Sequence, residues 1–324
     1  MADPAGWQAS GRMLRHAVGA AGRTASLAAL AGSTLRPMVE LHLHDAAAHR
    51  AAVQDERNRR EARLRDPTGW LSLVGLYWLQ EGEQHFGAGP LNEIVLRAEK
   101  GRVPAMTGTL ELTDGRVFVH PAPGDALTAD GRPVDDGTEL VDDEGDPPTT
   151  LELASLRLVL IRRGEAGVAL RVKDTSAPAL RSFAGLPYFD IDPRWRLPGR
   201  LIRAKPGTTI SVPDVVGNIL AEPSPGVVEF TVRGRPHRLD ALEAKPGHLW
   251  LIFRDGTSGH ETYGAGRFLV TGAVRPDDGV ELDFNLAYNP PCVFSPFATC
   301  PLPPERNQLS LRIEAGEKVW ELDH

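Results

Sequence analysis

The stretch VVEFTVRGRP, residues 227–236, shows the pattern that decides the fold of this chain. A short run rich in β-branched and aromatic residues meets a turn signal of Gly and Pro, which is typical of a strand entering a turn. The pairing recurs from Trp70 onward, with strand-like runs such as RVFVH, LRLVLIRR, HLWLIFRD, RFLVTGAV and VELDFNLAY, and LSLRIEAGEK is the last strand-like run. Many short strands at regular intervals predict a mostly β protein built from sandwiches or barrels.

One segment ahead of the strands has a helical pattern instead. Leu41, Ala48 and Ala52 fall at helical spacing, and the following QDERNRREARLR is interpreted as a charged, solvated stretch. Asp66-Pro67 ends this pattern, because the residue before a proline disfavours helical dihedral angles. We therefore predict a helix over residues 38–66.

The rest of the chain divides into a leader and two β units. A length of 324 residues suits about two domains. Residues 1–37, rich in Ala, Gly and Arg, are expected to form a flexible leader. A seam near residues 164–200, where strands give way to loop-like sequence, separates a predicted β-sandwich over 67–165 from a barrel-like unit over 166–324. The second unit contains a proline-rich crossover, AYNPPCVFSPFATCPLPPERN (residues 287–307).

Composition narrows the classes of function. A net charge of −7 argues against a nucleic-acid-binding protein, which needs a basic face to neutralise phosphates. No run of 18 apolar residues exists, so no membrane span is expected. The sequence has no convincing export signal, which favours a cytoplasmic location.

The first β unit resembles a forkhead-associated domain. The resemblance rests on GEQHFGAGPLNEIVL (82–96) and LTADGRPVDDGTELVDDEG (127–145), and it covers roughly residues 70–165. It implies a strand-rich sandwich. Ala88 stands where the family has an arginine that grips phosphate, and alanine offers no bidentate, charge-assisted bonds. We therefore expect a scaffold role without phosphopeptide recognition.

Two stretches of the second unit concentrate polar side chains. In RVKDTSAP, alternation along a strand places Arg171 and Lys173 on one face, where they can hold an anion or form a solvated surface. The stretch HETYGAGR gathers His260, Glu261 and Tyr263 as candidate acid/base groups, with Arg267 as a candidate anion ligand. The alternative is a hairpin with exposed polar residues.

A third polar stretch, DFNLAYNPPC, contributes the remaining candidate ligand-binding residues. On a strand, Phe284 and Leu286 face the core, and the other face is solvent or the lumen of a ligand barrel. The candidates on this stretch are Asp283, Asn285, Tyr288 and Asn289.

The two cysteines, Cys292 and Cys300, lie in the proline-bound segment that follows. They are interpreted as packed thiols on the crossover, and a reversible pair is the alternative. No Cys-x-x-Cys or His-Glu-x-x-His spacing occurs, so we predict no metal site. No motif identifies a cofactor.

The chain also resembles the uncharacterised bacterial and archaeal family "domain of unknown function 1684". Its matching peptides include ETYGAGRFL, LDFNLAYNPPCVFSPFATCPLPPERNQL and IEAGEK, and the resemblance covers about residues 68–319. The family implies no reaction.

The polar residues of the second β unit favour a small anionic or polar ligand bound in a pocket of that unit, with or without turnover. The alternative is a protein-interaction scaffold that acts through the first unit.

Overall fold

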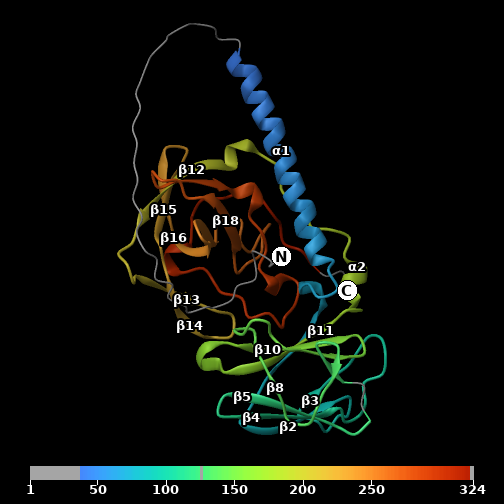
Figure 1. Ribbon diagram of the computed structural model, residues 1–324. Helices are drawn as coiled ribbons and strands as arrows, with labels where there is room; N and C mark the ends of the chain where they lie inside the picture. The colour runs from blue at the N-terminus through green and yellow to red at the C-terminus, as the bar shows by residue number, and fades with distance from the viewer. Residues whose placement is uncertain (1–36, 125–126, 322–324) are drawn as a thin grey trace, which may run out of the picture.

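A computed structural model describes residues 37–124 and 127–321 (Figure 1). The predicted mostly β fold is confirmed, and the described part contains two α-helices, α1 (Pro37–Leu64) and α2 (Pro178–Ser182). Neither helix combines the length and apolar character that crossing a membrane requires. The predicted leader lies outside the described residues, apart from Pro37.

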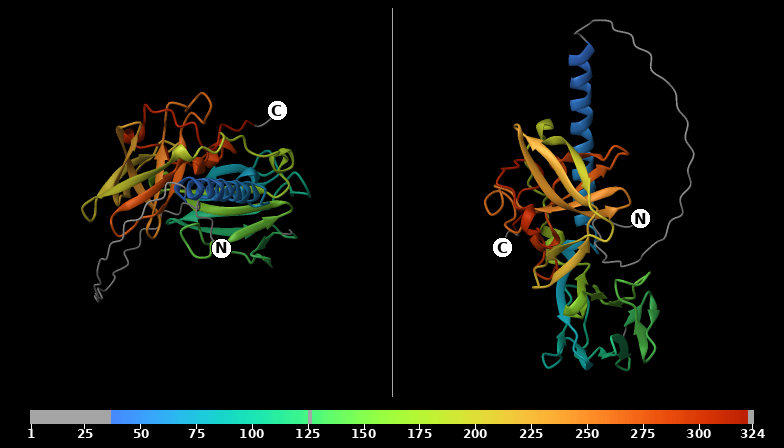
Figure 2. Two further views of the ribbon diagram at one scale, coloured as in Figure 1. Left: turned by 90° about the horizontal axis from the view of Figure 1, so that it is seen from above. Right: turned by 90° about the vertical axis from the view of Figure 1, so that its left-hand side faces the viewer.

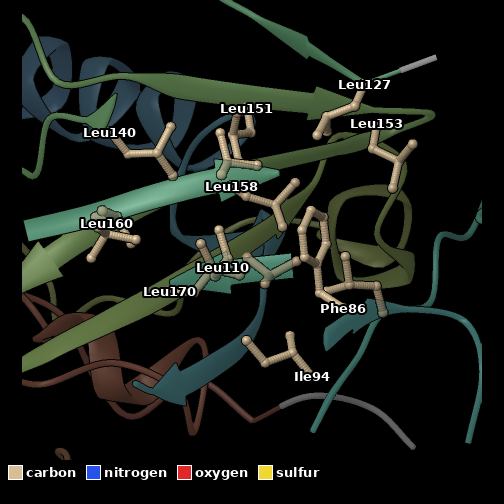
Figure 3. Packing of buried hydrophobic residues seen from close by; sticks show 14 of the residues in the cluster. Phe86, Ile94, Leu110, Leu127, Leu140, Leu151, Leu153, Leu158, Leu160 and Leu170 are labelled. Carbon is tan, nitrogen blue, oxygen red and sulfur yellow. The ribbon is translucent and has the colours of Figure 1, made fainter. Parts of the chain in front are cut away.

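Two sheets enclose the first hydrophobic core. Phe86, Ile94 and Leu110 from one sheet meet Leu158 and Leu170 from the other (Figure 3). Alternating buried residues along the strands produce this layer, because successive side chains point to opposite faces. The six-stranded sheet has the order β1 (Leu73–Trp78), β11 (Val168–Asp174), β10 (Leu156–Arg162), β9 (Thr150–Leu153), β6 (Thr128–Ala129), β7 (Arg132–Pro133). The five-stranded sheet has the order β3 (Ile94–Val95), β2 (Gly82–Gly87), β4 (Gly108–Thr113), β5 (Arg116–Pro121), β8 (Thr138–Leu140).

A second six-stranded antiparallel sheet curls into a nearly closed barrel. Its order is β18 (Arg267–Ala273), β17 (His248–Phe253), β16 (Arg235–Lys245), β15 (Gly226–Val232), β12 (Arg196–Arg203), β19 (Gly279–Asp283). The end strands β18 and β19 contact each other, which nearly closes the ring. Phe230, Phe253 and Phe284 fill its interior together with aliphatic side chains. The hairpin of β13 (Thr209–Pro213) and β14 (Ile219–Pro223) forms a separate small sheet.

Helix α1 runs along the side of the barrel toward the junction with the sandwich (Figures 1 and 2). Among residues 45–64 of the helix, whose burial the structure describes, the buried ones are His49, Val53, Arg57, Arg60 and Leu64, a stripe at helical spacing. Arg57 and Arg60 are each only 8% exposed, so the prediction that QDERNRREARLR is a solvated stretch is wrong at these two positions. The polar members of this stripe, His49, Arg57 and Arg60, face carboxylates and carbonyls that are far away in the sequence.

The segment after β19 is irregular. The expected strand VELDFNLAY ends at Asp283 and continues as a 3-10 turn, Phe284–Leu286. The strand-like LSLRIEAGEK is not a strand in the structure, and this expectation is wrong. Its backbone bonds to loops instead: Leu309 N donates to Arg254 O (2.8 Å) and Ile313 N to Asp255 Oδ2 (2.6 Å). Such bonds satisfy a buried chain without a ladder.

Candidate functional site

A cavity of about 640 Å³ lies between α1 and the barrel, and we call it the α1 cavity. The helix forms one wall. Strands β12 and β16 to β19, with residues 285–288, form the other. Its lining mixes aliphatic side chains with ionisable ones, including Asp45, His49, Val53, Arg57, Arg60, Tyr188, His248, Val270, Asp283, Asn285, Leu286 and Tyr288. Sites for small molecules usually have this volume and this mixture.

A chain of hydrogen bonds holds one histidine of the helix. Asn285 is fixed first, because its Oδ1 accepts from Asp192 N and its Nδ2 donates to Asp192 O, both at 2.9 Å. Asn285 N and Nδ2 then donate to Asp283 Oδ1 at 3.1 and 2.9 Å. The second carboxylate oxygen, Oδ2, lies 2.6 Å from His49 Nε2. Buried His49 Nδ1 has no partner among the described residues.

Arg60 has two hydrogen-bond acceptors in segments far away in the sequence. It donates from Nε to Glu317 Oε1 at 3.1 Å and from Nη2 to Asn289 O at 2.9 Å. Burial lowers the pKa of Arg60, but the charge and hydrogen bond of Glu317, together with Tyr288 and Tyr188, outweigh burial, and the net shift is upward. Arg60 therefore fastens the helix to the crossover.

Arg57 differs from Arg60. Its Nη2 donates to Phe189 O at 3.0 Å, and its guanidinium lies 4.3 Å from the centre of the Tyr188 ring. Within the described residues no carboxylate lies at ion-pair distance, and buried Arg57 Nε has no acceptor. The buried hydroxyl of Tyr188 is likewise unpaired. Burial lowers the pKa of Arg57 and raises that of Tyr188, so the phenol keeps its proton and remains a donor.

The structure brings one predicted group of residues to the α1 cavity. Asp283, Asn285 and Tyr288 line it. Asn289 is completely buried behind the lining, where its N donates to Glu317 Oε2 at 2.7 Å and its side-chain amide to Lys318 O at 2.7 Å. Asn289 therefore positions other groups.

Arg267 lies inside the barrel wall. It is 0% exposed and donates to the carbonyl oxygens of Ala315, Ile313 and Glu317, with Asp255 Oδ1 at 3.4 Å. Gly266 precedes it at φ +102°, and a Cβ there would lie 2.5 Å from Phe253 O, so only glycine fits. This arginine connects the barrel to the C-terminal segment and is not among the residues that line the α1 cavity.

The proposed acid/base residues lie on the loop between β17 and β18, apart from the α1 cavity. His260 is exposed. Glu261 pairs with Arg312 at the surface, and this bond lowers the pKa of the carboxyl. Burial raises the pKa of Tyr263, and the thiols of Cys292 and Cys300 raise it further. These three residues therefore do not meet Asp283 and Asn285.

Arg171 and Lys173 share one face of β11, as alternation predicts, and both cations lie over the ring of Trp70. Burial lowers the pKa of Arg171 to about 10, and the charge of Arg163 adds to this effect. Asp143 and Cys300 act against this lowering of the Arg171 pKa. Residues 37–124 and 127–321 contain no cluster of three His, Cys, Asp or Glu residues suited to a metal.

Sequence reasoning missed His49, Arg57 and Tyr188. The spacing of His49, Val53, Arg57, Arg60 and Leu64 was an available signal, since it matches one face of a helix. Charged residues at those positions read as solvated because their partners lie more than 100 residues away.

Comparisons with known proteins place part of the chain in a family. No curated protein matches. An uncharacterized protein of Haloarcula marismortui, solved by solution NMR, is 33% identical, and the match covers 45% of this chain and 83% of that chain with a TM-score of 0.37. Neither match concerns a forkhead-associated domain, so that resemblance stays a prediction. Residues 181–318 match the family model described as Protein of unknown function (DUF1684), and through this segment the chain belongs to that family.

Proposed function

We propose that the α1 cavity binds a small molecule with an anionic group, and that Arg57 and Tyr188 hold this group. Arg57 carries the proposal, because it is a buried guanidinium without a carboxylate at ion-pair distance among the described residues. A buried charge without a partner is costly, whereas a planar guanidinium binds carboxylate or phosphate through two parallel bonds. The free hydroxyl of Tyr188 offers another donor beside it.

The remaining lining supports an organic ligand over a simple ion. Val53, Val270 and Leu286 provide apolar surface next to the polar groups. His49, held by Asp283, presents a second unsatisfied polar atom, Nδ1, two helical turns from Arg57. A ligand with an anionic head and an apolar body matches this arrangement.

Thermal unfolding with a panel of carboxylates and phosphate esters tests the proposal. A ligand at one hundred times its Kd stabilises a protein by about 2.7 kcal/mol, which raises Tm measurably. We expect at least one member of the panel to raise the Tm of the wild type, and Arg57→Gln to abolish that shift. Tyr188→Phe should weaken it.

Arg50→Ala is the matched control, because Arg50 lies on the exposed face of the same helix and does not line the cavity. This variant should respond like the wild type. A panel that stabilises neither protein, or a shift that Arg57→Gln retains in full, would contradict the proposal.

A further inference from the structure

We propose that Cys292 and Cys300 are a redox-active dithiol that reduces a hydroperoxide and forms a reversible intramolecular disulfide, with Cys292 as the attacking residue. This site is separate from the α1 cavity and does not depend on the function proposed for it. Both cysteines are free thiols in the structure.

The fold of the loop brings the two cysteines together. Cys292 N donates to Cys300 Sγ at 3.1 Å, and the two side chains hydrogen-bond each other. Cys292 Sγ also lies 3.7 Å from Ala298 O, so the loop folds back on itself between the cysteines. Ser295 Oγ fixes this loop to the sandwich through Leu73 O at 2.8 Å. The pairing is therefore built into the folded chain.

The two thiols have different environments, and the difference assigns their roles. Cys292 is half-buried, whereas Cys300 is 4% exposed in a cluster with Leu73 and Ala298. The hydrogen bond from Cys300 lowers the pKa of Cys292, and burial raises that of Cys300. The accessible thiol is thus the better thiolate, as in cysteines that react with oxidants. The buried thiol needs to reach only its neighbour.

Two side chains of other elements complete the site. Burial raises the pKa of Cys300 and the cation of Arg171 on β11 opposes this rise, while both thiols add to the effect of burial in raising the pKa of Tyr263. Arg171 Nε is buried without an acceptor in the described part of the chain. A guanidinium beside a dithiol favours the thiolate form and offers a donor to the oxygen of a bound oxidant.

The chemistry balances with the hydroperoxide as the two-electron oxidant. The Cys292 thiolate attacks the outer oxygen, the S–O bond forms, and the O–O bond breaks. The alkoxide that leaves takes up the proton that the thiol gave up and becomes an alcohol. When the oxidant is hydrogen peroxide, the leaving group is hydroxide and the product is water. Cys300 then attacks the sulfenic acid, the disulfide forms, and hydroxide leaves with the Cys300 proton as water. An external thiol restores both cysteines by exchange.

Intact mass measured on the full chain tests the proposal. Reduced protein is treated with hydrogen peroxide, quenched, denatured and labelled with N-ethylmaleimide. We expect the untreated protein to take up two labels and the oxidised protein none, with its mass lower by two hydrogens. Dithiothreitol should restore both labels. A non-reducing gel should show a monomer, since a dimer would mean that the disulfide joins two chains and would contradict the proposal.

Single substitutions test the order of attack. With dimedone present during oxidation, Cys300→Ser should carry one adduct, on Cys292, because its sulfenic acid has no partner. Cys292→Ser should carry none. An oxidised wild type that still takes up two labels would overturn the proposal even if both variants misfold. A dimedone adduct on Cys292→Ser would overturn the assignment of Cys292 as the attacking thiol.

Discussion

Arg60 Nε lies 3.1 Å from Glu317 Oε1, although 257 residues separate the two in the chain. Both side chains are less than one-tenth exposed, and Glu317 Oε2 accepts from Asn289 N at 2.7 Å. This pair joins the first helix to the C-terminal segment that contains Glu317. It also fixes the position of α1, and hence the shape of the α1 cavity.

Removing one partner of this pair should destabilise the protein strongly. We expect Arg60→Ala to lower the free energy of unfolding by about 3–5 kcal/mol, because it removes the hydrogen-bonded cation that pairs with buried Glu317. Urea unfolding followed by circular dichroism measures this change. Arg59→Ala, which removes a 61% exposed cation paired with Glu56, should change it by less than about 0.5 kcal/mol. Equal effects of the two variants would show that α1 is not docked through Arg60.

Arg267 should prove essential to stability rather than to ligand binding. We expect Arg267→Met to cost about 3–5 kcal/mol, because Asp255 would stay buried without its cation and several carbonyls would lose their donor. Arg267→Lys should not restore the loss, since an ammonium cannot reproduce the guanidinium fork. The control is Arg275→Ala, at a cation 58% exposed beside Asp277. A lysine variant as stable as the wild type would contradict this role.

Tyr188 should be among the last tyrosines to ionise. Burial raises its pKa above the ordinary 10.0, so the unfolded chain releases this proton first as pH rises. The contribution of Tyr188 to stability is therefore complete below about pH 10 and is lost as pH rises through the higher pKa of the folded state. Ultraviolet titration of the wild type and of Tyr188→Phe should differ only at the high-pH end. A difference centred near pH 10 would contradict the burial of this hydroxyl.

Alkylation should distinguish the two cysteines by pH. The hydrogen bond from Cys300 lowers the pKa of Cys292 below the ordinary 9.0, while burial raises that of Cys300. Tyr263 and Arg171 are the other titratable groups at the pair. With iodoacetamide at pH 8, we expect Cys292 to react at least about tenfold faster than Cys300. Cys300→Ser should shift the pH at which the alkylation rate of Cys292 is half-maximal. The reason is that a serine hydroxyl forms a different hydrogen bond with Cys292 from the one that the thiol forms. Equal alkylation rates of Cys292 and Cys300 at every pH would contradict a difference between their pKa values.

Local patterns predicted the elements of this fold with little error. The run RVFVH became β5 and LRLVLIRR became β10, each extending or ending within one residue of the pattern. Turn chemistry and the two-residue alternation act within a few residues, so they are legible without the rest of the chain. The same reasoning placed Arg171 and Lys173 on one face of β11. It failed for LSLRIEAGEK, because a strand-like composition does not ensure a ladder, and this segment forms only an isolated bridge, between Glu317 and Tyr188.

The candidate site depended on distances that no local pattern contains. Alternation identified Asp283 and Asn285 as side chains on one face, but only the docking of α1 gives Asp283 its partner His49, 234 residues earlier. Whether an arginine is solvated or buried depends on what covers it, and Arg57, Arg59 and Arg60 look alike in the sequence. The sequence by itself determined which segments form strands and the helix. The tertiary structure decided which charges are buried, because burial and pairing depend on elements that are far apart in the sequence and meet only in the folded chain.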